Sequence, residues 1–165
     1  MKVYFAADHA GFALKNELLN LVRGEMSLDV EDCGAYMHEA SDNYPEIIAR
    51  AAKLLSADAK KGIDSRAILV GASGQGEAMV ANRFAYVRAA VYYGEKGSQT
   101  DTDGRELDMI TSTRAHNDAN ALSLGARFLS LDEARVAVRS WLTLPFSNGA
   151  RHTSRIAQIE QVSHE

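Results

Sequence analysis

A glutamate ends the glycine-rich segment Gly71-Ala72-Ser73-Gly74-Gln75-Gly76-Glu77. An apolar run, 67–70, precedes this segment, and a helix-like stretch, 78–83, follows it. A strand that leads through such a turn into a helix leaves backbone N–H groups free to bind an anion. A carboxylate beside them suits a base next to a developing oxyanion better than it suits simple phosphate binding. Glu77 is therefore a candidate base, and a structural turn with a solvated Glu77 is the alternative.

Two histidines stand in polar segments next to expected strands. Asp8-His9-Ala10-Gly11 follows the apolar run 3–7. Asp8 alone is typical of a helix N-cap, whereas His9 suits anion binding or proton transfer. His116-Asn117-Asp118-Ala119-Asn120 precedes an apolar strand, and a polar turn there explains the amides but not the histidine.

Three arginines are candidate anion ligands. Arg151 and Arg155 are four residues apart, so both can reach one phosphate from one face of a helix. The alternative is a solvated basic face, but such faces usually include acids, and 150–159 has none. Arg127, after Leu124-Gly125-Ala126, can add a third guanidinium.

Several site classes lack their signatures. The glycine-rich loop has no Gly-Lys-Ser/Thr, and Met79 stands where a dinucleotide fingerprint needs its third glycine. The five histidines and the single Cys33 show no metal-binding spacing, so no metal is expected. A Ser–His–Asp hydrolase is not expected either, because no G-x-S-x-G elbow is present.

The composition limits the class of protein. The chain has 165 residues, 46% hydrophobic and 24% charged, which is typical of one globular domain. Its net charge of -4 argues against nonspecific nucleic-acid binding, and no apolar run approaches the roughly 20 residues of a membrane span. One cysteine rules out an internal disulfide, and residues 1–5 read as a strand, so a cytoplasmic protein is expected.

Short apolar runs alternate with helical patterns along the chain. We expect strands at 3–7, 28–33, 67–70, 87–92 and 120–125, and helices at 10–21, 43–56, 78–83, 130–142 and 152–161. This alternation predicts an α/β fold with a mainly parallel sheet covered on both faces. Ligands then sit beyond the carboxyl ends of the strands, an edge that collects Asp8, His9, the Gly71 loop and Arg127. The polar stretch 94–104 is expected to be an extended surface loop within a single domain, 1–165, that ends in a helix from about 150.

In this order and spacing, the motifs resemble the ribose-5-phosphate isomerase B family, which includes galactose-6-phosphate isomerase subunits. The resemblance covers almost the whole chain and depends on Asp8-His9-Ala10-Gly11, Tyr44-Pro45, Gly74-Gln75-Gly76, Ala81-Asn82-Arg83, residues 116–120, Leu124-Gly125-Ala126-Arg127 and Arg151-His152 with Arg155. It implies an aldose–ketose isomerase of sugar phosphates that needs no metal or other cofactor. D-Ribose 5-phosphate to D-ribulose 5-phosphate, a pentose phosphate pathway step, is the expected reaction. It also implies a Rossmann-like three-layer α/β/α sandwich with a five-stranded parallel sheet, and a homodimer or tetramer whose active sites combine residues of two protomers.

The resemblance also implies roles for single residues. Many members use a cysteine base at the position of Gly71, whereas another branch uses a glutamate after the second loop glycine, as Glu77 does here. A carboxylate can move a proton from C2 to C1 through a cis-enediolate. The implied roles are as follows: Ser73, Gly74 and Gly76 hold the enediolate oxygen, His116 opens the sugar ring, His9, Arg127, Arg151 and Arg155 bind the phosphate, and Asp8, Tyr44 and Asn117 contact the sugar. The helix N-terminus is expected to lower the pKa of Glu77 and so weaken it as a base.

The chain departs from the family pattern in two further places. Asn43 stands where the family often has an aspartate before Tyr-Pro, although Asp42 is adjacent, and the segment 94–115 is longer than is usual in the family. That segment directly precedes His116, so it can act as a lid or alter the choice of substrate. The alternatives are an isomerase of a four- or six-carbon sugar phosphate and a non-catalytic sugar-phosphate binding protein. A nucleotide-binding regulator would need phosphate-loop signatures that are absent.

Overall fold

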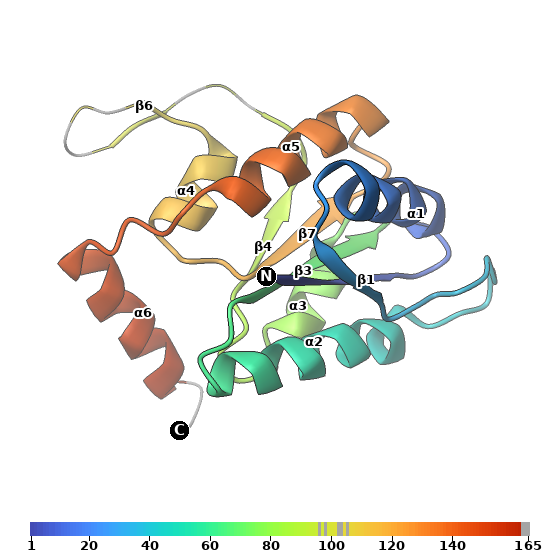
Figure 1. The fold of residues 1–165 in the computed structure, drawn as a ribbon, viewed down its shortest axis with the longest axis horizontal. Helices are drawn as coiled ribbons and strands as arrows, with labels where there is room; N and C mark the ends of the chain where they lie inside the picture. The colour runs from blue at the N-terminus through green and yellow to red at the C-terminus, as the bar shows by residue number, and fades with distance from the viewer. Residues whose placement is uncertain (96, 98, 102–103, 105, 163–165) are drawn as a thin grey trace.

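The structure, a computed structural model, describes residues 1–95, 97, 99–101, 104 and 106–162. Strands and helices alternate along the chain (Figure 1). The strands are β1 (Lys2–Ala7), β2 (Asp29–Asp32), β3 (Ser65–Gly71), β4 (Ala89–Tyr92), β5 (Gln99–Thr100), β6 (Glu106–Leu107) and β7 (Ala121–Gly125). The helices are α1 (Phe12–Asn20), α2 (Tyr44–Lys60), α3 (Gln75–Ala81), α4 (Met109–Ala115), α5 (Leu131–Thr143) and α6 (Ala150–Val162), with a π-helical turn, η1 (Leu21–Glu25), after α1.

The main sheet is parallel, with five strands in the order β2-β1-β3-β7-β4. Alternate residues of β1 point to opposite faces of this sheet, as a strand requires. Phe5 packs in a core with side chains of α1 and α5, whereas Tyr4 and Ala6 pack in a second core with α2 and α3. These two layers lie above and below the sheet in Figure 1. The predicted three-layer α/β sandwich with a five-stranded parallel sheet is therefore confirmed.

Local signals explain where two of the covering helices begin. Pro45 stands in the first turn of α2, where its missing N–H costs no hydrogen bond. A capping box begins α5: the Ser130 hydroxyl accepts the Glu133 N–H, and the Glu133 carboxylate accepts the Ser130 N–H. Both helices bury an apolar stripe against the sheet, which fixes the strand ends that carry the candidate site residues.

The region before β7 differs most from the sequence prediction. The polar stretch 94–104 contains β5, which pairs with β6 in a two-stranded antiparallel ribbon. Helix α4 follows, although no helix was predicted there. Asp108 caps α4 by accepting the Thr111 N–H, and Ile110 is buried. This helix delivers His116, its C-terminal cap residue.

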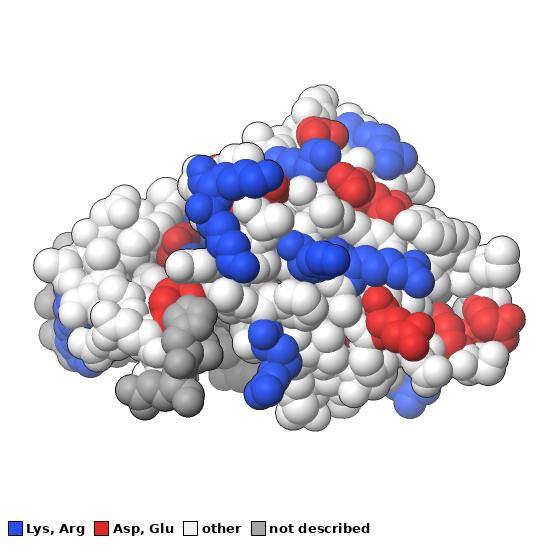
Figure 2. Space-filling view, turned by 90° about the horizontal axis from the view of Figure 1, so that it is seen from below, with Lys and Arg blue, Asp and Glu red and all other residues white. Residues whose placement is uncertain are grey.

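The C-terminal helix α6 extends away from the sandwich (Figure 1). None of its residues is buried, and Ile159 and Val162 are 54% and 71% exposed. Glu160 joins it to the body by accepting the Tyr86 N–H at 2.9 Å and a hydrogen bond from Arg88 at 3.2 Å. Figure 2 looks onto the α2 side and shows Lys and Arg side chains across the middle of that face, with acidic side chains at its right-hand edge. A membrane-spanning helix is not found in the described part of the chain.

Candidate active site

The carboxyl ends of β1, β3 and β7 gather the first group of predicted site residues. Gly71 and Gly125 are paired at the ends of β3 and β7. Beyond them, the Ala126 N–H donates to the Gly71 carbonyl at 2.8 Å, and the Arg127 N–H donates to the Ala72 carbonyl at 3.1 Å. These bonds hold Arg127 beside the glycine-rich loop. We call Asp8, His9, Tyr44, Ser73, Gly74, Gly76, Glu77 and Arg127 the first half-site.

The glycine-rich loop depends on glycine at two of its positions. Gly74 has a φ of 74°, in the left-handed region, and caps α3, while the Ser123 hydroxyl donates to its carbonyl at 2.6 Å. At Gly76, an added Cβ would lie 2.7 Å from Cζ and Oη of Tyr44. The Tyr44 ring can therefore lie against the loop only because Gly76 has no side chain. The Ser73 hydroxyl accepts a long hydrogen bond from the Gln75 N–H at 3.4 Å.

Glu77 turns its carboxylate back over the end of β3. The residue is only 4% exposed, and an added Cβ on Gly71 would lie 2.0 Å from its Oε1. Burial is the largest influence on its pKa, which is raised above the usual range, and the nearby charge of Asp8 raises it further. A backbone hydrogen bond at the helix start acts in the opposite direction but is outweighed. The helix start therefore lowers this pKa as expected, but burial outweighs it, and the expected weakening of Glu77 as a base is not found.

Two further residues of the first half-site, Asp8 and His9, follow β1. Asp8 is buried and accepts the N–H groups of Ala10 and Gly11, both at 3.1 Å. His9 is held by Asp42: its ring Nδ1 lies 2.7 Å from Asp42 Oδ1, and its backbone N–H donates to the same oxygen at 3.2 Å. Asn43 caps α2 without a side-chain hydrogen bond. Asn43 and Asp42 were the two candidates to replace the family's acid before Tyr44, and Asp42 is the one that contacts a site residue.

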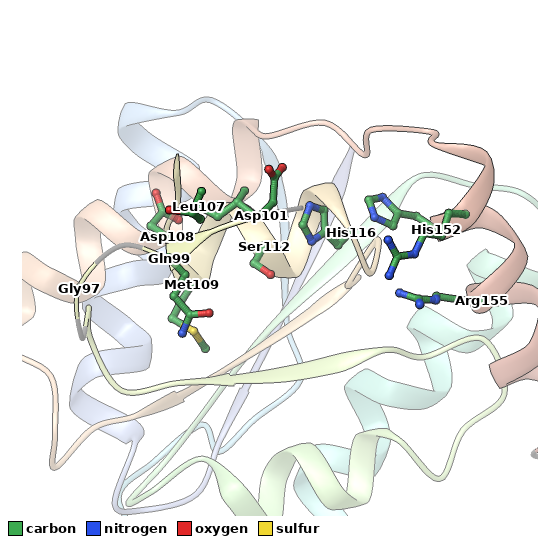
Figure 3. Close-up of a pocket in the computed structure, with 12 residues that line it drawn as sticks. Gly97, Gln99, Asp101, Leu107, Asp108, Met109, Ser112, His116, His152 and Arg155 are labelled. Atoms are coloured by element: carbon green, nitrogen blue, oxygen red, sulfur yellow. The ribbon is translucent and has the colours of Figure 1, made fainter. Parts of the chain in front are cut away.

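A second group of predicted residues lines a pocket of about 340 Å³ between α4, α6 and the β5–β6 ribbon (Figure 3). His116, Arg151 and Arg155 line it, together with Gln99 and Ser112. The His116 ring lies 4.3 Å from that of His152, measured between ring centroids. His152 Nδ1 is hydrogen-bonded to the Ser147 hydroxyl at 3.1 Å, a contact that the sequence did not predict.

Asn117 follows His116 on the exposed turn before β7, and its carbonyl accepts from Arg88 at 3.2 Å. We call His116, Asn117, Arg151 and Arg155 the second half-site.

The two half-sites lie at opposite ends of the strands of the sheet. The first follows the carboxyl ends of the strands, whereas His116 and Asn117 precede the start of β7 and α6 lies on that same side (Figure 1). The six residues of β1 span roughly 20 Å from one end of the sheet to the other, at about 3.3 Å per residue. One chain therefore brings Asp8, His9, Glu77 and Arg127 together, as predicted, but does not bring Glu77 and His116 into one pocket.

Two further groups bear on cofactor and thiol chemistry. Within the described residues, Asp8, His9 and Asp42 have donor atoms within 4.8 Å of one another, close enough to share a metal ion. Here the same atoms hydrogen-bond to one another or to backbone amides.

Cys33 is buried at the end of β2, and burial raises its pKa to about 12, so its thiol is not poised to act as a base.

Known proteins resemble this chain over nearly its full length. The sequence pattern of the family described as "Ribose/Galactose Isomerase" matches residues 3–159. The ribose-5-phosphate isomerase B of Mycolicibacterium paratuberculosis is 33% identical over 156 residues, which are 94% of this chain and 87% of the relative. The Escherichia coli protein of the same name is 32% identical over 162 residues, 98% of this chain and 95% of the relative.

Solved structures agree with the sequence matches. Ribose-5-phosphate isomerase B from Mycoplasma genitalium, solved with bound ribulose-5-phosphate, aligns with a TM-score of 0.85 at 28% identity, covering 99% of this chain and 97% of that one. The Clostridium thermocellum enzyme aligns with a TM-score of 0.83 at 31% identity, covering 99% and 98%. This chain, which matches the family's pattern over residues 3–159, belongs to the ribose/galactose isomerase family.

Proposed function

We propose that this protein is a ribose-5-phosphate isomerase that interconverts D-ribose 5-phosphate and D-ribulose 5-phosphate in the cytoplasm. The observation that carries the proposal is the buried Glu77 carboxylate, which lies over Gly71 at the carboxyl ends of the parallel strands, where sheets of this kind bind ligands. Relatives over nearly the whole chain are named for this reaction, and one solved relative holds ribulose-5-phosphate.

Glu77 acts as the base in this proposal. The ionised carboxylate removes the proton from C2 of the open-chain aldose and returns it to C1, with a cis-enediolate between the two steps. Burial raises the pKa of Glu77, and a carboxylate with a raised pKa is a stronger base than an exposed one. The Ser73 hydroxyl and the loop amides at Gly74 and Gly76 stabilise the negative enediolate oxygen.

The other predicted residues bind the substrate and open its ring. His116 moves the proton that opens the furanose, because an imidazole can give and take protons near neutral pH. A phosphate monoester carries about -1.5 to -2 charges, which suits the guanidiniums of Arg127, Arg151 and Arg155 together with His9. Asp8, Tyr44 and Asn117 contact the sugar hydroxyls.

A second copy of the chain completes the site in this proposal. Glu77 and His116 act on one substrate molecule, yet roughly 20 Å of sheet separates the two half-sites within one chain. In a homodimer, the first half-site of one protomer meets the second half-site of the other. The helix α6, which carries Arg151 and Arg155, supports this arrangement, since its apolar Ile159 and Val162 are exposed in the single chain.

Subunit mixing tests the base, the ring-opening group and the shared site together. We expect Glu77→Gln and His116→Ala to be inactive alone. When equal amounts of the two variants form dimers at random, half of the dimers contain one subunit of each variant. Each of these mixed dimers has one of its two sites intact, the one that combines the wild-type Glu77 of one subunit with the wild-type His116 of the other. The mixture should therefore regain about a quarter of wild-type activity. A mixture that contains mixed dimers, verified by native mass spectrometry, but stays inactive would contradict a shared site. Near-normal turnover by Glu77→Gln alone would remove Glu77 from the base role.

A substrate panel tests the reaction itself. We expect ketose formation from D-ribose 5-phosphate to exceed that from four- and six-carbon aldose phosphates in kcat/KM, measured with a coupled assay. A higher kcat/KM for another sugar phosphate would change the substrate. Tight binding of ribose 5-phosphate without any ketose formed would favour a non-catalytic binding protein.

A further inference from the structure

Among the described residues, the side chain of Asp42 is hydrogen-bonded to His9 alone. Its Oδ1 accepts from both the ring Nδ1 and the backbone N–H of His9. Its Oδ2 is buried and has no hydrogen-bond partner among the described residues, and the side chain as a whole is only 12% exposed. Burying a carboxylate is costly unless it is paired. A residue that only closed the loop before α2 would not need this charge, so the pair with His9 requires an explanation.

The pair fixes how the His9 ring is presented. When Nδ1–H donates to Asp42, the other ring nitrogen, Nε2, is directed away from the carboxylate. No hydrogen-bond partner of Nε2 is found in the part of the chain that the structure describes. A carboxylate behind a histidine sets its tautomer and orientation in the same way at many metal and catalytic sites. When the ring is an imidazolium, Nε2 also carries a proton, and His9 then has one N–H donor with no partner among the described residues.

The charges around His9 come from three parts of the fold. Asp8, at the end of β1, lies 4.0 Å from its Nδ1, and Asp42 lies at 2.7 Å on the loop before α2. His38, on the same loop, packs edge-on at 6.1 Å between ring centroids, and Arg127, after β7, is the cation that opposes protonation of His9. The hydrogen bond to Asp42 is the largest influence on the pKa of His9, which is raised.

We propose that Asp42 is a positioning residue for phosphate binding: its carboxylate, 2.7 Å from Nδ1, orients the His9 ring and pairs with it as an imidazolium, so that Nε2–H donates to the anion beside Arg127. This inference rests on the proposed function, in which His9 binds the substrate phosphate. The sign follows from the direction of the shift. Because the pKa of His9 is raised, the imidazolium and its contribution to phosphate binding persist to higher pH than for an ordinary histidine, and they are lost as the pH rises through the raised pKa.

Asp42→Asn and Asp42→Ala separate charge from orientation. The amide oxygen of Asn can still accept the Nδ1–H but carries no charge, whereas Ala removes both. Asn43→Ala is the matched control, since Asn43 is adjacent and exposed and makes no side-chain cap. The probe is inorganic phosphate, whose binding is measured by calorimetry on the intact protein between pH 6 and 9. The His9 ring is titrated by NMR, with its signal assigned by comparison with His9→Gln.

We expect Asp42→Asn to weaken phosphate binding roughly tenfold near pH 7.5, the scale of one charge-assisted hydrogen bond, and to move the alkaline loss of binding to lower pH. Asp42→Ala should weaken it further, Asn43→Ala by less than about twofold, and the NMR midpoint of His9 should fall in both Asp42 variants. In kinetics, KM should rise more than kcat falls. An unchanged midpoint and unchanged phosphate affinity in a folded Asp42→Asn protein would overturn the proposal. Neither binding nor NMR depends on turnover, so this outcome is distinct from failure of the isomerase assignment.

Discussion

Gly71→Ala is the substitution that tests the position of the Glu77 carboxylate most directly. The added methyl carbon would lie 2.0 Å from Oε1, 2.1 Å from Cδ and 2.5 Å from Oε2 of Glu77. Real Cβ contacts are not closer than about 3.0 Å, so the carboxylate has to move by at least the difference, 3.0 − 2.0 = 1.0 Å. The backbone of Gly71 is not in the left-handed region, so alanine adds no backbone strain there.

The expected loss of activity follows from that displacement. A misplacement of about 1 Å can cost roughly 10²-fold in rate, and loss of a general base costs up to about 10⁴-fold. We therefore expect the kcat of Gly71→Ala to fall by about 10² to 10⁴, which corresponds to about 3 to 5 kcal/mol of transition-state stabilisation. The phosphate ligands lie elsewhere in the site, so the affinity for inorganic phosphate should change far less.

The assay is the steady-state rate of ketose formation from ribose 5-phosphate, with thermal unfolding by circular dichroism as the check on folding. Gly24→Ala is the control, because no atom lies within 4 Å of the added carbon and its φ is also unexceptional. It should retain activity within about twofold. A folded Gly71→Ala protein with turnover within about threefold of wild type would show that Glu77 does not act from this position.

Two other variants report on the same site. Glu77→Gln should unfold at a higher temperature than wild type at pH 7, because the raised pKa of Glu77 means that its charged carboxylate destabilises the fold. The difference between the two unfolding temperatures should shrink as the pH falls towards about 4, where the carboxylate of the unfolded chain is also protonated. A difference that grows on acidification would contradict this reasoning. Arg155→Ala should raise KM about tenfold or more with little change in kcat. The reason is that an exposed guanidinium at the phosphate stabilises the bound substrate and the transition state alike. An unchanged KM in steady-state kinetics would remove Arg155 from the phosphate site.

The strands and the first half-site were predictable because their signals are local. An apolar run predicts a buried strand such as β3, and parallel strands place their carboxyl ends at one edge. Helix α4 was missed because its β-branched residues Ile110, Thr111 and Thr113 favour helices weakly. It is stabilised instead by the Asp108 cap and by burial of Ile110 and Thr113 in the folded protein.

Properties that depend on distant residues were not predictable from the sequence. The pKa of Glu77 is raised by burial, for which Gly71 leaves room at the end of β3, and by the charge of Asp8, which directly follows β1. The local helix start alone pointed in the opposite direction. Likewise, the contact between His9 and Asp42 spans 33 positions of the chain, and only the path of the loop before α2 brings the two together.

The separation of the two half-sites has a consequence for how the protein responds to dilution. If a second copy completes each site, a dissociated subunit is inactive, because its own base and its own ring-opening group lie at opposite ends of the strands. Specific activity then falls as the protein is diluted below its dimer dissociation constant, and in that range the total rate grows with the square of the concentration. Measuring activity against concentration would therefore yield the strength of the subunit contact without any structural probe.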